Sequence, residues 1–170
     1  QWKPLKRTPI ISKGAFDSHN LCFYDTNYAK YRCYSRYFAI PGTETQVNDF
    51  DDICIGVRAV QSNTSPDMLH WSESQVNTYE DGVPLEHFYT NATVMCPGAE
   101  HFYLSFPMRF MPERYKVEGH PHVGISDSVF MSSRNGVHFN RPFLDSWIRP
   151  DLDYRNWTQR NYITAWGILE

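Results

Sequence analysis

The fold is indicated by the segment Ser65-Pro66-Asp67-Met68-Leu69-His70-Trp71-Ser72, which recurs roughly 70 residues later as Ser133-Arg134-Asn135-Gly136-Val137-His138-Phe139-Asn140. In both copies a turn is followed by a histidine–aromatic pair, which we expect in a short outer strand. Similarity at a fixed period is typical of repeat architectures, in which one supersecondary unit is used several times. The sequence therefore predicts two related units.

Looser similarities extend this repeat in both directions. Tyr34-Ser35-Arg36-Tyr37-Phe38 resembles Ser105–Phe110, and Asn20–Tyr24 resembles Phe88–Ala92. A third copy begins at Tyr162-Ile163-Thr164-Ala165-Trp166. We therefore place the first unit at about 15–75, the second at about 84–145 and the start of a third at about 160–170.

Each unit is expected to contain four strands. In the first unit they are predicted at 18–24, 30–38, 53–61 and 69–73, and in the second at 86–94, 101–110, 128–133 and 137–141. Apolar residues mostly alternate and prolines interrupt many windows, so we expect an all-β fold without a long helix. Four antiparallel strands per repeat favour the blades of a β-propeller, with a β-sandwich as the alternative.

The number of units has a consequence for the whole molecule. Each blade of a propeller buries its faces against neighbouring blades, and two blades with the start of a third do not close a ring. The chain is therefore expected to be part of a larger propeller, or one part of an assembled or cleaved one. The remaining blades are its expected partner, in the same chain or in another one.

Composition limits the class of protein. The chain has 170 residues, 41% of them apolar and 16% aromatic, with a formal net charge of −3. These values suit one folded domain and argue against a nucleic-acid partner, which selects for a basic face. No apolar run approaches the roughly 18 residues that span a bilayer, so no membrane partner is expected. The start, Gln1–Pro4, does not resemble a signal peptide.

The four cysteines include no C-x-x-C pair, which disfavours a zinc ribbon or a redox motif. Cys22 and Cys33 would face each other if Tyr24 and Tyr31 close a hairpin around the turn Asp25–Lys30. Either a cross-strand disulfide or two buried thiols would fit that arrangement.

Five segments together resemble a known family: Phe16-Asp17-Ser18-His19-Asn20, Asp67–Ser72, Gly98–Pro107, Phe130–Phe139 and Asn161–Leu169. They are similar to a bacterial group of five-bladed propellers that resembles the N-terminal domain of glycoside hydrolase family thirty-two and is related to family forty-three. The resemblance covers about residues 8–170.

This resemblance implies a carbohydrate-active propeller with its site in the central funnel, and a periplasmic or extracellular location is expected. Better-known members use an Asp near the start of the innermost strand of the first blade, and Asp17 falls on that position. They add a second Asp in the next blade and a Glu acid in the following one. The Asp-Pro-Asn, Arg-Asp-Pro and Glu-Cys motifs of those members are absent, and the resemblance places the region of the acid beyond Glu170.

Blade geometry gives a candidate site independently of the family. Funnel groups come from the start of the first strand, the end of the second and the loop into the third. Strand starts supply Asp17, His19, Glu86 and His87, and strand ends supply Arg36 and Arg109. The loops supply Asp49, Asp51, Asp52, Glu118, His120, His122 and Asp127.

Glycoside hydrolysis needs two carboxyl groups on opposite sides of the scissile bond. Asp17 is the predicted base and Glu86 the predicted second carboxylate, so the leading hypothesis is a glycosidase acting on a poly- or oligosaccharide. His19, Arg36, His87 and Arg109 are the predicted substrate-binding residues. Arginine could bind a substrate carboxylate or hydroxyls through paired hydrogen bonds.

Other interpretations of these residues remain open. Arg36 and Arg109 could instead form structural ion pairs with the acidic cluster Asp49–Asp52. That cluster could hold calcium but lacks the usual spacing, and we interpret His120-Pro121-His122 as incidental, so no cofactor or metal is predicted. His70 and His138 are interpreted as parts of the outer strands. A non-catalytic carbohydrate-binding propeller and a protein-interaction propeller are the alternative functions.

Overall fold

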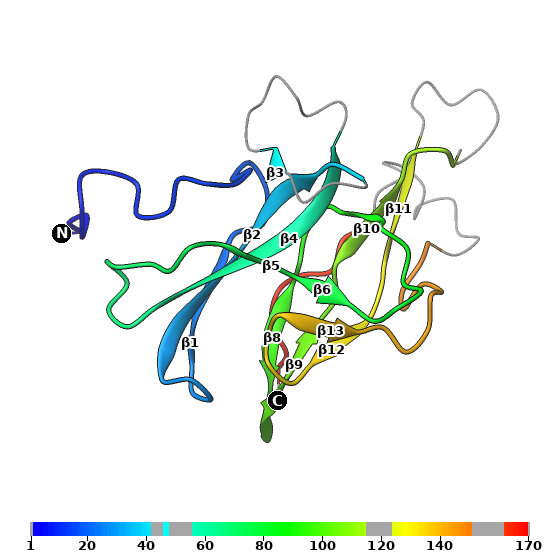
Figure 1. The fold of residues 1–170 in the computed structure, drawn as a ribbon. Helices are drawn as coiled ribbons and strands as arrows, with labels where there is room; N and C mark the ends of the chain where they lie inside the picture. The colour runs from blue at the N-terminus through cyan, green and yellow to red at the C-terminus, as the bar shows by residue number, and fades with distance from the viewer. Residues whose placement is uncertain (1, 42–45, 48–55, 115–123, 151–161, 170) are drawn as a thin grey trace.

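The computed structural model describes residues 2–41, 46–47, 56–114, 124–150 and 162–169 (Figure 1). These residues form β-strands joined by turns, and none of them lies in a helix, which confirms the all-β prediction for this part of the chain. Accordingly, the described chain contains no helix that is long and apolar enough to cross a membrane.

The first sheet is an antiparallel meander of β1 (Leu21–Asp25), β2 (Lys30–Ala39), β4 (Val57–Ser65) and β5 (Gln75–Val76), with β3 (Gln46–Val47) paired to the end of β2. The Asp25 carboxylate accepts the N–H of Asn27 at 3.1 Å and so stabilises the turn into β2. Cys22 lies opposite Cys33 in this hairpin, as predicted. Both are free thiols, but Cys22 is exposed and Cys33 is half-buried, so the expectation of two buried thiols was wrong. Burial, with a smaller contribution from Cys22, raises the pKa of Cys33 to about 12.

The second unit is also an antiparallel meander, made by β8 (Thr93–Cys96), β9 (Ala99–Ser105), β12 (Met131–Ser133) and β13 (His138–Asn140), with β6 (Thr78–Tyr79) parallel to β13. A three-stranded sheet of β7 (His87–Phe88), β10 (Met108–Met111) and β11 (Ile125–Ser128) continues it. The β9 ladder stops before Pro107, which has no N–H to donate, and β10 resumes the same direction in the new sheet.

The two similar turn segments that the sequence indicated also share a pattern of hydrogen bonds. Ser65 and Ser133 end β4 and β12, and each begins the same polar turn. Oδ1 of Asp67 accepts the backbone N–H groups two and three residues further on, at 2.8 Å each, and Oδ1 of Asn135 does the same at 2.9 and 2.8 Å. Both turns therefore have one physical basis, in which a short polar side chain replaces backbone pairing.

Several predicted strands are placed differently. The span 69–73 is not a strand, because the Asp67 turn holds it and Met68 has a φ of +64°; His70 therefore lies in a turn, unlike His138 in β13. The third strand is described at Val57–Ser65, so it extends four residues beyond its predicted end at 61, while 53–55 lie outside the described residues. The predicted strand 86–94 is divided into β7 and β8, since Ala92 has a φ of +41°. Left-handed backbone of this kind does not continue a strand.

One hydrophobic core joins the two units. It contains Leu21, Tyr34 and Val60 from the first unit and Phe88, Tyr103, Val129, Met131 and Phe139 from the second. The sheets thus bury their facing surfaces against each other, as adjacent layers do in both propellers and sandwiches. The described residues do not close into a barrel or a ring of blades, so the five-bladed propeller remains a prediction.

A buried carboxylate connects the two units beside this core. Asp25 is fully buried and accepts hydrogen bonds from Arg32 Nε at 2.6 Å and from the Tyr103 hydroxyl at 2.7 and 2.8 Å. Burial raises the pKa of Tyr103 to about 12, so the phenol remains a donor at neutral pH. Tyr34 donates to the Gly136 carbonyl at 2.7 Å, and a Cβ on Gly136 would lie 2.9 Å from that hydroxyl. These contacts fix how the units are placed relative to each other.

We expect Asp25→Ala to lower the free energy of unfolding by about 3 to 5 kcal/mol, because it leaves the Arg32 guanidinium buried without its carboxylate. Chemical denaturation followed by tryptophan fluorescence measures this change. Asp81→Asn, at an exposed position, is the control and should keep the wild-type midpoint. A wild-type midpoint for Asp25→Ala would show that this carboxylate does not hold the units together.

Candidate functional site

Three segments that the sequence placed before or at the start of an innermost strand meet in the structure. Ser18 donates its hydroxyl proton to the Tyr89 carbonyl at 2.6 Å. This bond joins the segment just before β1 to the segment just before β8, and we call such segments lead-in segments. Trp166, from the third predicted copy, donates its indole N–H to the Thr93 carbonyl at 2.8 Å. The segments before β1 and before β8 and the segment that contains Trp166 therefore meet at one place.

A pocket of about 450 Å³ lies where these segments meet. His19, Tyr89, Ile163 and Trp166 are among the residues that line it. Its volume falls within the roughly 300 to 1,000 Å³ that is usual for sites that bind small molecules. The pocket is therefore large enough for a ligand and combines aromatic surface with a titratable side chain.

His19 and Trp166 give this pocket its chemistry. Burial lowers the pKa of His19, so its imidazole is neutral at neutral pH and offers one donor and one acceptor nitrogen. Its Nδ1 has no hydrogen-bond partner among the residues described. The Trp166 ring is 44% exposed, while its N–H is already bonded to the backbone, so one edge is fixed and apolar ring surface is left open.

Asp17, the predicted base, directly precedes this pocket in the chain. Its side chain is 43% exposed, and its carboxylate accepts a hydrogen bond from Arg36 Nη2. The Arg36 guanidinium is buried between two rings, 5.3 Å from the centre of Phe38 and 5.0 Å from that of Tyr89. The structure thus brings two predicted residues together, with Asp17 open to solvent and Arg36 behind it.

Arg58 is a further member of this group that sequence reasoning missed. Its guanidinium lies 4.8 Å from the Tyr89 ring centre, and its backbone N–H and Nη1 approach His87 Nδ1 at 3.3 and 3.2 Å. Because both neighbours are donors, Nδ1 is assigned as the acceptor and Nε2 carries the proton. Burial and the Arg58 charge lower the pKa of His87, and burial and Arg36 contribute to a lowered pKa of Arg58.

The other predicted pair, Glu86 and Arg109, belongs to a buried ionic network. Arg109 bonds the Asp127 carboxylate through Nε at 2.9 Å and Nη2 at 2.6 Å, and Glu86 through Nη1 at 3.0 Å. Glu86 also accepts a hydrogen bond from Arg141, whose side chain is fully buried. These contacts agree with the alternative interpretation of Arg109 as part of a structural ion pair. Its acidic partners among the described residues are Asp127 and Glu86.

The remaining predicted groups lie outside the described residues. These are Asp49, Asp51, Asp52, Glu118, His120 and His122, so the structure says nothing about calcium or histidine ligation there. Within the described ranges, no group of three or more His, Cys, Asp or Glu side chains could hold a metal ion.

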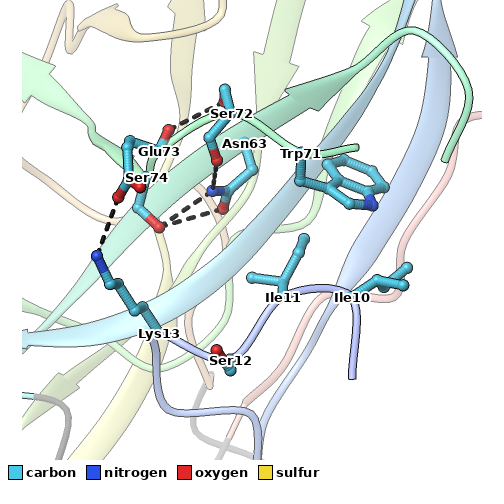
Figure 2. A pocket seen from close by; sticks show the side chains of 9 residues that line it. All are labelled: Ile10, Ile11, Ser12, Lys13, Asn63, Trp71, Ser72, Glu73 and Ser74. Atoms are coloured by element: carbon cyan, nitrogen blue, oxygen red, sulfur yellow. Dashed lines mark hydrogen bonds and ion pairs between the residues drawn. The ribbon is translucent and has the colours of Figure 1, made fainter. Parts of the chain in front are cut away.

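A second hollow lies on the outer side of the first sheet, where the N-terminal segment packs against it (Figure 2). Trp71 stands beside Ile10 and Ile11, and Lys13 forms an ion pair with Glu73 at 3.0 Å. The hollow has a volume of only about 160 Å³, below the usual range of ligand sites. We therefore interpret it as the packing of the N-terminal segment and not as part of the site.

Comparison with known proteins gives one informative result. No protein-family profile matches the chain, and no curated protein matches it by sequence. The solved structure of an N-acetylgalactosamine deacetylase from F. plautii, in complex with blood group B trisaccharide, is similar with a TM-score of 0.53 and 10% sequence identity. The match covers 82% of this chain and 33% of that chain. The chain thus shares a fold with about a third of a carbohydrate-processing enzyme.

If Glu86 is structural, Glu86→Ala should destabilise the protein, because two buried guanidinium groups then lose an acceptor. The expected loss is about 3 kcal/mol, the lower end for a broken buried pair, since Glu86 retains some exposure. Urea denaturation measures it, with the exposed Glu113→Ala as control. A loss below about 0.5 kcal/mol would contradict a structural role.

Proposed function

We propose that this chain is part of a five-bladed propeller that binds a poly- or oligosaccharide at the pocket formed by His19, Tyr89 and Trp166. The observation that carries the proposal is this pocket, placed where the two lead-in segments meet the segment that contains Trp166. A flat ring such as that of Trp166 can cover the apolar C–H face of a pyranose, while a neutral imidazole can donate to or accept from hydroxyl groups.

The comparison supports the same class of ligand. The similar solved structure is of an enzyme that acts on an amino sugar, and it contains a trisaccharide. Since that similarity concerns the fold, the proposal for this chain depends on its own pocket. The remaining blades, in the same or another chain, would complete the wall of the funnel.

Hydrolysis of a glycosidic bond is the second candidate, and the exposed carboxylate of Asp17 beside the pocket favours it. Arginine only donates hydrogen bonds, so the carboxyl groups of Asp17 and Glu86, both bonded to arginine, act as acceptors. Asp17, which is partly exposed, therefore suits the base or nucleophile, and Glu86 is the second candidate carboxylate. The proton donor that the reaction also needs would come from a group other than these two.

Trp166→Ala should weaken saccharide binding at least tenfold, because it removes the stacking surface, while the melting temperature changes little. The measurement is titration calorimetry against a panel of neutral oligosaccharides that includes blood group B trisaccharide. Trp2→Ala is the matched control, since Trp2 is 99% exposed at the N-terminus. Equal binding by both variants would exclude the pocket as the saccharide site.

Asp17→Asn should abolish glycan hydrolysis by the intact protein that contains this chain and leave its fold and its saccharide affinity nearly unchanged. Release of reducing ends from polysaccharides measures hydrolysis, with Asp145→Asn, an exposed position, as control. Retained turnover in Asp17→Asn would remove Asp17 from the mechanism without affecting the binding proposal.

A further inference from the structure

A groove on another part of the molecule carries chemistry that the proposed site does not use. It has a volume of about 600 Å³ and runs between the two meanders, with Lys30 and Arg32 of β2 and Gln75 of β5 on one side and His138 of β13 on the other. A neighbouring hollow of about 420 Å³ shares His138 with it and adds Arg134. The two hollows share His138 and Asn135 as lining residues, and we refer to them together as the inter-sheet groove.

The inter-sheet groove is basic in a chain whose net charge is −3. Lys30, Arg32 and Arg134 line the two hollows, and no Asp or Glu is among the lining residues of either one. Arg32 is neutralised from behind by the buried Asp25 at 2.6 Å. Lys30 and Arg134 are exposed and form no ion pair with any residue that the structure describes. Two uncompensated positive charges therefore face this groove.

The other lining residues are aromatic, amide and hydroxyl side chains, which are of the kinds that contact sugars in proteins. Tyr28 is 48% exposed at one side, and the Arg32 guanidinium lies 5.2 Å from its ring centre. His138 Nδ1 lies 3.0 Å from the Thr78 hydroxyl, which leaves its Nε2 for another partner. Arg134 is held over the Phe102 ring at 4.4 Å, so its guanidinium is positioned before any ligand arrives. Aromatic, amide and hydroxyl groups thus accompany the cations.

We propose that the inter-sheet groove is a second saccharide-binding site, selective for glycans that carry carboxylate or sulfate groups. This inference extends the proposed saccharide binding and rests on it. Lys30 and Arg134 supply charge to the oxyanions, and Gln75, Tyr28 and His138 contact the sugar hydroxyls and ring. Because both cations are exposed, the attraction depends on ionic strength.

The test is calorimetry of the full chain with a uronate tetrasaccharide, a sulfated tetrasaccharide and a neutral one of the same length. The double variant Lys30→Gln, Arg134→Gln should bind the anionic probe at least tenfold more weakly and the neutral probe as wild type does. Lys3→Gln, Lys6→Gln, at exposed N-terminal positions, is the control with the same loss of charge. The uronate and sulfate arms show which oxyanion is recognised.

Trp166→Ala separates this inference from the proposed function. Loss of neutral binding in Trp166→Ala, with anionic binding retained, is the expected result. Unchanged anionic binding in the groove double variant, or wild-type protein that prefers neither anionic probe to the neutral one, would overturn the groove proposal alone. Tighter binding of a single-stranded oligonucleotide of equal charge would also overturn it, since the groove would then recognise nucleic acid.

Discussion

The buried carboxylate of Asp25 is the interaction on which the arrangement of the two sheets depends. It lies at the turn between β1 and β2 and is bonded to Arg32 of its own sheet and to Tyr103 of the other. A buried charge is tolerated only when its partners have good geometry, so this contact permits few relative positions of the units. In that position the apolar side chains that face each other across the two sheets pack together and form the shared core.

This placement also explains where ligands could bind. With the two units fixed side by side, the segment before β1 lies next to the segment before β8, and Trp166 lines the same pocket as His19. The inter-sheet groove lies on another part of the same boundary, between strands of both sheets, and Arg32 is among the residues that line it. One interface therefore generates an aromatic pocket beside Asp17 and a basic groove lined by Lys30.

Local chemistry was predictable from the sequence, and long-range pairing was not. The β1–β2 hairpin and its Cys22–Cys33 register follow from alternating residues around a turn, and the Ser65 and Ser133 turns follow from short polar side chains. The division of a strand at Ala92 depends on its backbone conformation, which its residue type does not indicate. The partners of Arg109, and the stacking of Arg58 beside His87, arise only once distant strands are packed. The sequence could therefore nominate charged residues such as Arg36 and Arg109, but it could not say which partners each of them would have.

NMR mapping of saccharide binding on the labelled chain tests most directly whether His19, Tyr89 and Trp166 form a saccharide pocket. We predict that an oligosaccharide that binds will shift the indole N–H signal of Trp166 together with the amide signals of His19 and Tyr89. Saturable binding that leaves these three signals unchanged, and instead shifts residues on the outer side of the first sheet, would contradict it.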